Sequence, residues 1–399
     1  MSNSRDEFLV ACARVTIVLV LAYIILFVSS CAYDASFHDC AVACADDSGC
    51  PDDLSCGSEG LCRTAGATAA CSTIGGDGGS DGSDGSDGSG GSSFPSCAQL
   101  AATCGPNGND DCCSTATPIP GGTYYRSYDL GSDGMFSDMS YPATVSSFVL
   151  DKYEVTVGRF RAFVASGGGT QADPPATGAG AHAQIADSGW DASWDTDLEG
   201  DAASLSAALA CDSQYATWTA SPGANEALPI NCVTWYEALA FCAWDGAFLP
   251  TESEWNYAAA GGNEQRAYPW SNPAGSLTVD CSYANYDVDG GPTYCVPGIN
   301  GAVATMNRVG SESPKGDGAW GQSDLGGNAW EWTLDWYATY VNPCDDCASL
   351  TPTGSNRVIR GGDFSAAEMY MRTGNRGLLT LDSAPANRSR NVGFRCARP

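Results

Sequence analysis

The segment Arg360–Gly377, RGGDFSAAEMYMRTGNRG, has the composition of a binding loop and not of a reactive one. It reads as the end of a strand, a Gly-Gly turn and an irregular loop, the setting in which proteins often place functional side chains. Its carboxylates are Asp363 and Glu368, and it contains no Cys, His or Lys to act as a nucleophile or general base. Such a loop can hold a polar ligand through ion pairs and hydrogen bonds, but it offers little for covalent chemistry.

Capping signals predict the helices that position this loop. Thr156 can begin a helix that Gly167 ends, after an alternating apolar stretch that predicts a strand. Thr-x-x-Glu capping boxes begin two more helices. The first follows Thr234 and runs to Trp244, with Gly246 terminating it, and the second follows Thr251 and is ended by Gly261. Most of the remaining sequence is Gly, Pro, Asn and Asp. We therefore predict an α+β domain over residues 114–399, low in regular secondary structure and stabilised by aromatic packing and disulfides.

The amino-terminal 30 residues are predicted to be an export signal. A fourteen-residue apolar run, Val15 to Val28, follows Arg5 and Arg14. Because a transmembrane helix needs about 20 apolar residues, this run favours a signal peptide. The ending VSSC resembles a bacterial lipobox, in which Cys31 would carry the lipid. The alternative is an uncleaved anchor helix over residues 8–28. Both place the rest of the chain outside the cytoplasm, held at a membrane.

The cysteines indicate an oxidising compartment. Of the 20 cysteines, 18 remain when Cys12 and Cys31 are set aside, and these 18 fall in groups of six, four and eight. The even counts predict disulfides closed within each group. Residues 31–71 form a Cys-rich segment, residues 72–96 a Gly/Ser/Asp linker, and residues 97–113 a second small Cys-rich knot.

Charge excludes one class of partner. The formal net charge is −29, from 47 acidic and 18 basic residues. Because no basic stripe is left for phosphates, we do not expect nucleic-acid binding. The acidic balance supplies oxygen ligands suited to calcium.

Eight collinear motifs carry a resemblance to a known family. They are IPGGTYY, FVLDKYEVTVGRFRAFV, LPINCVTWYEALAFCAW, LPTESEWNYAAAGG, YPW, SDLGGNAWEWTLDWY, RVIRGGDF and RNVGFRCAR. Together they resemble the formylglycine-generating enzyme, or sulfatase-modifying factor, family over residues 115–399. The resemblance implies a C-type-lectin-like fold. It also implies that Cys242 and Cys396 form the family's structural disulfide.

The catalytic residues of that family are missing. Its formylglycine-forming members place two copper-binding cysteines after the Gly-Gly turn, whereas here residues 363–370 contain no Cys and the next one is Cys396. Its iron-dependent relatives use three histidines, and this chain has His38 and His182. We therefore assign no catalytic residue and expect no copper. Whether the chain is an enzyme stays open.

One motif supports a catalytic alternative. An oxidase with an atypical active site could use Cys344 and Cys347, which have CxxC spacing. A redox role would require a helix amino terminus behind the motif, and zinc would require two further ligands. A disulfide is the simpler expectation.

The resemblance implies calcium as a structural cofactor. Two carboxylates, Asp324 and Glu331, and the carbonyls of Gly327 and Ala329 match a family calcium loop, a ligand set suited to a hard cation. Glu331 could instead pair with an arginine, with Trp330 and Trp332 in the core. A second site could include Asn285 and Tyr286, with its acidic ligand undetermined.

The resemblance also implies a cleft. Trp330, Asp363, Arg376 and Asn391 match family positions that line the peptide-binding cleft. Arg376 suits carboxylates or carbonyls, although it could equally be a structural bridge to Asp363 or to a loop carbonyl. We expect a non-catalytic module that binds a peptide, a glycan or a protein, on surface loops that include the insertion from Gly167 to Ala227.

Overall fold

The computed structural model describes residues 94–98, 100–291, 293–298, 302–352, 354–377 and 383–399, and the backbone of residues 54–56 and 62–64. The chain divides into two units, Met1–Asp87 and Gly88–Pro399. In the first unit, β1 (Leu54–Cys56) and β2 (Cys62–Thr64) pair antiparallel. The signal peptide, Cys31 and most of the linker lie outside the described residues. Within the described ranges, no helix is long and apolar enough to span a membrane.

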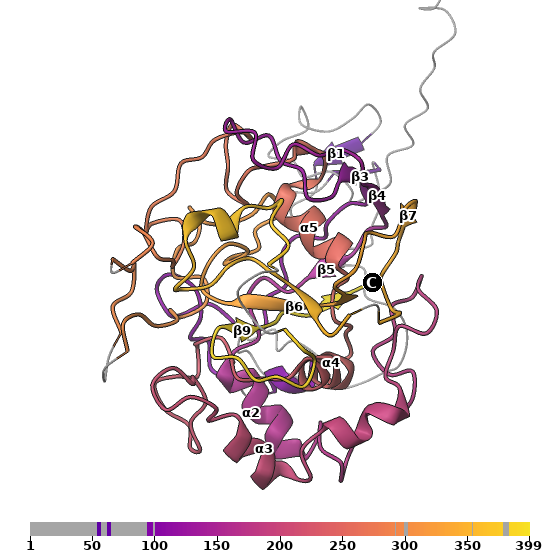
Figure 1. The fold of residues 1–399 in the computed structure, drawn as a ribbon, viewed down its shortest axis with the longest axis vertical. Coiled ribbons are helices and arrows are strands. Elements are labelled where there is room, and N and C mark those ends of the chain that lie inside the picture. The colour runs from indigo at the N-terminus through magenta and orange to yellow at the C-terminus, as the bar shows by residue number, and fades with distance from the viewer. Residues whose placement is uncertain are drawn as a thin grey trace, which may run out of the picture. The chain divides into compact units, whose positions relative to one another are not determined.

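The second unit is built from short elements joined by long loops (Figure 1). Its helical elements are η2 (Pro95–Cys97), α2 (Val157–Ser166), η3 (Ala192–Asp197), α3 (Ala202–Ala208), α4 (Trp235–Trp244), α5 (Glu252–Ala260), η4 (Gly262–Glu264) and η5 (Glu368–Met371). Its strands are β3 (Gly122–Tyr125), β4 (Pro142–Val145), β5 (Val149–Leu150), β6 (Trp330–Trp336), β7 (Cys344–Asp345), β8 (Arg357–Arg360), β9 (Val392–Gly393) and β10 (Ala397–Arg398).

The predicted helix caps are confirmed. Thr156 caps α2 by accepting a hydrogen bond from the Arg159 amide, and Gly167 ends the helix with φ +85°. Both Thr-x-x-Glu sequences form reciprocal capping boxes, at the starts of α4 and α5. These bonds satisfy amide groups that a helix leaves without a partner at its amino terminus. Local sequence thus determines where the three helices begin.

Three small sheets surround the core. The strand β6 is the centre of the sheet β8-β6-β9, pairing antiparallel with β8 and parallel with β9. The other two sheets are β3-β4-β7 and β10-β5. In Figure 1, β6 crosses the middle of the unit, with α4 on one side and α5 on the other. The largest apolar cluster joins α2, α4 and β6, so this sheet is a rigid support for the loops at its ends.

Disulfides join the loops to this frame. The four cysteines of the predicted knot pair with one another, and the eight later cysteines form four further pairs: Cys97–Cys113, Cys104–Cys112, Cys211–Cys232, Cys242–Cys396, Cys281–Cys295 and Cys344–Cys347. The six cysteines from Cys40 to Cys71 lie in the first unit, largely outside the described residues.

The segment 97–113 packs into the second unit. Tyr153 donates a hydrogen bond to Asp110 (2.9 Å), and Arg308 donates to the carbonyl of Gly105 (3.1 Å). Its cysteines share a small apolar cluster with Tyr153. The knot therefore extends the larger domain.

Candidate ligand-binding cleft and cation-ligand residues

The Gly-Gly turn brings the loop after β8 close to the core. Gly361 and Gly362 have φ values of +103° and +79°, which favour glycine. A Cβ atom on Gly361 would lie 3.3 Å from the Trp255 ring and 3.4 Å from the carbonyl oxygen of Leu325. The turn therefore needs glycine for conformation as well as for space. It places Asp363 beside Trp330, the first residue of β6.

Three of the four predicted cleft residues come together around Asp363. Its Oδ1 accepts hydrogen bonds from the amide (2.6 Å) and hydroxyl (2.7 Å) of Ser365, and its Oδ2 accepts one from Asn391 (2.8 Å). Burial raises the pKa of Asp363, while hydrogen bonds from Asn391, Ser365 and Trp330 oppose the rise. Asp363 thus organises the loop, with the Trp330 side chain beside it.

Arg376 lies in a different environment. Its guanidinium makes two hydrogen bonds to Glu252, both 2.6 Å, and one of 2.9 Å to the carbonyl of Ala338. It also lies 3.9 Å from the centre of the Tyr340 ring. The bridge to a loop carbonyl is therefore present, but its carboxylate partner is Glu252 and not Asp363. Because Glu252 is buried, this ion pair ties the Arg376 loop to the start of α5.

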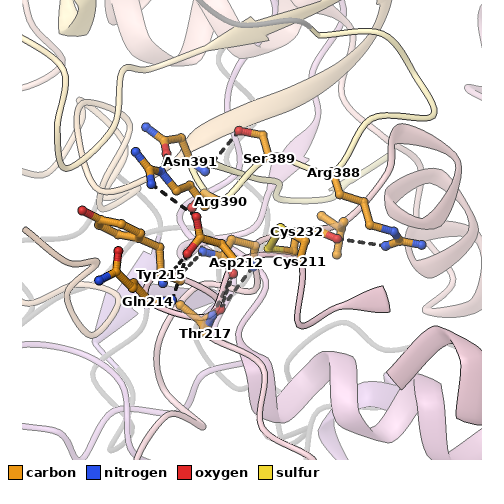
Figure 2. The surroundings of a disulfide bond; sticks show 12 residues. Cys211, Asp212, Gln214, Tyr215, Thr217, Cys232, Arg388, Ser389, Arg390 and Asn391 are labelled. Carbon is orange, nitrogen blue, oxygen red and sulfur yellow. Dashed lines mark hydrogen bonds and ion pairs between the residues drawn. A yellow bond between two sulfur atoms is a disulfide. The ribbon is translucent and has the colours of Figure 1, made fainter. Parts of the chain in front are cut away.

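Residues that directly precede Asn391 in the sequence line a polar pocket of about 400 Å³. Its lining comes from the insertion and from the segment before β9, and comprises Cys211, Asp212, Asn387, Arg388, Ser389 and Arg390. Figure 2 shows the two segments facing each other beside the Cys211–Cys232 disulfide. The pocket mixes hydrogen-bond donors and acceptors, which suits a polar ligand.

Tyr215 connects this pocket to the Asp363 loop. The Arg390 guanidinium lies 3.9 Å above the Tyr215 ring and 3.2 Å from the Asp212 carboxylate (Figure 2). Tyr215 also stacks on Phe364 with a centroid separation of 6.0 Å. The pocket together with the partly exposed Tyr215 forms an accessible surface, which we call the cleft: Cys211, Asp212, Tyr215, Asn387, Arg388, Ser389 and Arg390. The predicted cleft residues Trp330, Asp363 and Asn391 are buried and do not line it.

Sequence reasoning missed Asp212, Tyr215 and Arg390 as cleft residues. Two signals could have identified them. The first is that Asp212 and Tyr215 lie in the insertion that we expected to carry recognition loops. The second is that Arg390 directly precedes Asn391. Residue 212 and residue 390 are 178 positions apart, and only the fold brings them together.

Glu331, one of the predicted calcium ligands, forms a buried ion pair. Its two oxygens accept hydrogen bonds from Arg395 at 2.7 and 2.8 Å, and the Trp255 indole donates to it at 2.8 Å. Trp330 and Trp332 are both buried. The arrangement that we considered as the alternative to calcium is therefore present around Glu331.

Asp324 lies in a region with excess negative charge. It accepts a hydrogen bond from the amide of Gly310 (2.5 Å), and burial and the nearby Glu312 raise its pKa to about 8. Burial, together with the charges of Asp324 and Glu331, also raises the pKa of Glu154. Three buried oxygens in the polar side chains nearby have no hydrogen-bond partner among the described residues: Glu154 Oε1, Asn285 Oδ1 and Glu312 Oε2.

Carboxylate and amide oxygens of this kind are the ligands that a hard cation takes. Asn285 bonds to Asn328, which lies between Gly327 and Ala329, so the two predicted calcium segments touch. Asn328 also donates to Glu154. Among the described residues, no three His, Cys, Asp or Glu side chains are arranged to hold a metal by themselves. A calcium ion here would therefore depend on amide and main-chain oxygens as well as carboxylates, as calcium sites commonly do.

The fold and the cleft define the class of protein. Residues 105–399 match the profile of the family described as "Sulfatase-modifying factor enzyme 1-like domain", and the chain belongs to this family. Its α+β, disulfide-containing domain of short helices and small sheets has the C-type-lectin-like fold of that family.

Some relatives are named as formylglycine-generating enzymes and others as inactive forms of that enzyme. The chain is 31% identical over 298 residues to the formylglycine-generating enzyme of Streptomyces coelicolor, covering 70% of this chain and 87% of the relative. It is 31% identical over 172 residues to the inactive C-alpha-formylglycine-generating enzyme 2 of Mus musculus, covering 43% and 49%. A solved structure of PvdO from Pseudomonas aeruginosa aligns with a TM-score of 0.47 and 20% identity over 72% of this chain and 98% of that one.

Proposed function

We propose that this protein is an extracytoplasmic lipoprotein, anchored through Cys31, whose family domain binds a ligand without catalysing its oxidation. The ligand class is a peptide, a glycan or a protein segment that presents hydrogen-bonding groups to the cleft. The anchor rests on the VSSC sequence and on the disulfide-rich domain that follows it. Retention of a Cys31→Ser variant in the membrane fraction would contradict the lipid anchor.

One observation carries the non-catalytic proposal. The loop after Gly361–Gly362, where the family resemblance places a pair of catalytic cysteines, contains none from Asp363 to Gly377. Ser365 and Asn391 instead hold the Asp363 carboxylate by hydrogen bonds. A covalent thiol mechanism does not survive the loss of its nucleophile. The neighbouring pocket and the Arg390–Tyr215 pair supply groups for binding.

An oxidation assay tests this proposal against the alternative of an atypical formylglycine-generating oxidase. We expect no aldehyde when the full chain is incubated with copper, oxygen and a Cys-x-Pro-x-Arg peptide, and the peptide is followed by mass spectrometry. Formation of the aldehyde product would overturn the non-catalytic proposal. The Streptomyces coelicolor enzyme, named for this activity, serves as the positive control.

Binding is tested by panning a random peptide library and a glycan array against the full chain. Tyr215→Ala and Arg390→Ala should each reduce retained binding at least tenfold, since each removes a face of the cleft. Arg161→Ala is the matched control, because this arginine also pairs with a carboxylate, Glu226, and stacks on an aromatic ring, Trp218. Equal losses in all three variants would place the binding surface elsewhere.

We further propose that calcium stabilises the domain at the Asp324 region. Because Asn285 bonds to Asn328, we merge the two sites expected from the sequence into one. Asp324, Asn285 and the carbonyls of Gly327 and Ala329 would be ligands, with Glu331 shared with Arg395 and Tyr286 contributing its carbonyl. Bound calcium would supply charge compensation for the buried carboxylates. No reaction step is assigned to it.

Chelation should lower the melting temperature on the order of 5 °C, because a ligand at about 100 times its Kd stabilises by about 2.7 kcal/mol. Asp324→Asn should abolish the shift, since the amide oxygen can still accept from Gly310 but the charge is lost. Asp138→Asn, at an exposed aspartate outside the candidate ligand set, is the control and should retain the shift. An unchanged melting curve of the wild type on chelation would remove the calcium proposal.

A further inference from the structure

The Cys344–Cys347 disulfide differs from the other described disulfides in its position and surroundings. It joins residues three apart, at β7, with a Cα–Cα distance of 5.2 Å. Cys344 is buried, whereas Cys347 is half-buried. A thiol from solution would therefore reach Cys347 first, with Cys344 behind it as the protected member of the pair.

Arg126 supplies a positive charge at Cys347. Its Nη1 lies 3.6 Å from Cys347 Sγ, and its other hydrogen bonds go to the main-chain carbonyls of Tyr141, Pro142 and Val341. Arg126 is 2% exposed, and the described residues provide no carboxylate within ion-pair distance of it. A buried guanidinium without an anionic partner favours a thiolate beside it.

The amino terminus of α5 lies against the same sulfur atoms. Ser253, the second residue of α5, places its hydroxyl oxygen 3.5 Å from Cys344 Sγ and 4.0 Å from Cys347 Sγ. The hydroxyl can donate a hydrogen bond to a thiolate, and the helix amino terminus carries partial positive charge. The helix amino terminus that a redox CxxC motif requires is therefore present, supplied by a segment about 90 residues earlier in the chain.

The acidic groups around the disulfide are mostly engaged elsewhere. Glu252 pairs with Arg360 and Arg376, and Glu254 pairs with His182. Within the motif, Asp346 accepts hydrogen bonds from the amide and hydroxyl of Ser146, while Asp345 is exposed to solvent, which weakens its effect on the sulfur atoms.

We propose that Cys344 and Cys347 form a redox-active pair that exchanges with thiols or disulfides of cysteine-containing peptides or proteins. In the oxidised form, an external thiolate attacks Cys347 Sγ. The Cys344–Cys347 bond breaks, and Cys344 leaves as a thiolate next to Ser253. A second external thiolate then attacks the substrate sulfur of the mixed disulfide and releases Cys347 as a thiolate beside Arg126.

The balance is two thiols converted to one disulfide, with two electrons and two protons taken up by the protein pair. A second thiol–disulfide couple, poised more oxidising, returns the pair to its disulfide form by the reverse steps. The residues on both sides of the motif line a cavity of about 310 Å³, with residues 338, 339 and 341 on one side and residues 348–351 on the other. Neither cysteine lines this cavity, so it would hold part of the peptide beside the thiol and not the thiol itself. This activity does not depend on the cleft.

Redox titration of the full chain tests the proposal. The protein is equilibrated in glutathione buffers of increasing reducing power, trapped with N-ethylmaleimide and analysed by peptide mass spectrometry. Cys281–Cys295, whose Cys281 is exposed, is the internal control. We expect Cys344–Cys347 to be reduced at a ratio of reduced to oxidised glutathione at least tenfold lower than the control, equivalent to about 30 mV. Reduction of both disulfides at the same ratio would overturn the proposal.

A Cys344→Ser variant leaves Cys347 as a free thiol whose alkylation by iodoacetamide can be followed against pH. We expect a midpoint at least one unit below the ordinary thiol value of about 8.5, and a mixed disulfide with glutathione at Cys347. Arg126→Met in the same background should raise the midpoint, and Arg126→Lys should partly restore it. A midpoint of about 8.5 in the Cys344→Ser chain would contradict the role of Arg126. If the Arg126→Met variant does not fold, the Cys347 midpoint in the Cys344→Ser chain and the glutathione titration of the wild type test the proposal.

Discussion

Replacement of Arg395 by Met is expected to lower the free energy of unfolding by about 3–5 kcal/mol. Arg395 and Glu331 are both fully buried, and their closest atoms are 2.7 Å apart. Arg395 also donates to the carbonyls of Asp151, Lys152 and Ser323. Its loss would leave the Glu331 charge in a region that already has the carboxyls of Glu154 and Asp324. The penalty comes mainly from that uncompensated charge.

A double-mutant cycle with Glu331→Gln separates the pair from its surroundings. Glu331→Gln keeps an oxygen for the Trp255 indole and removes the charge, so Arg395→Met should cost less in that background. Guanidinium chloride unfolding at pH 7, with and without a chelator, gives the four free energies. A cost below about 1 kcal/mol for Arg395→Met in calcium, rising on chelation, would mean that a bound cation and not Arg395 neutralises Glu331.

The sequence was sufficient for the features that are local. A Thr and a Glu three residues apart form a capping box wherever the chain continues as a helix, so α4 and α5 could be located from eight residues. The motif order identified the family and its fold. The absence of cysteine after Gly361–Gly362 is likewise a statement about adjacent residues.

Features that depend on distant pairs could not be predicted. Arg376 bonds to Glu252, 124 positions away, and nothing near Arg376 in the sequence distinguishes that partner from Asp363. Arg126 and Cys347 are 221 positions apart. In a chain with 47 acidic residues, each buried arginine has several carboxylates with which it could pair. Only the packing of the helices and loops decides which carboxylate forms the ion pair.

Removal of the Cys242–Cys396 disulfide is expected to have the largest effect of any disulfide in the domain. It joins α4 to the last residues of the chain across 154 positions. In the chain-entropy description, a loop of this size restricts the unfolded chain enough to stabilise the folded state by about 5 kcal/mol. A Cys242→Ala/Cys396→Ala variant should unfold at a correspondingly lower concentration of guanidinium chloride.

Two matched variants make a graded series. Cys281 and Cys295 are 14 positions apart, and Cys344 and Cys347 are three apart, so their double-alanine variants should lose about 3 and about 2 kcal/mol respectively. Equal losses in the three variants would mean that local strain and packing, not chain entropy, set the contribution. The predicted order has a functional consequence. The disulfide that contributes least to folding is the one with Arg126 beside it, so its sulfur atoms can be opened by exchange while the rest of the domain stays folded.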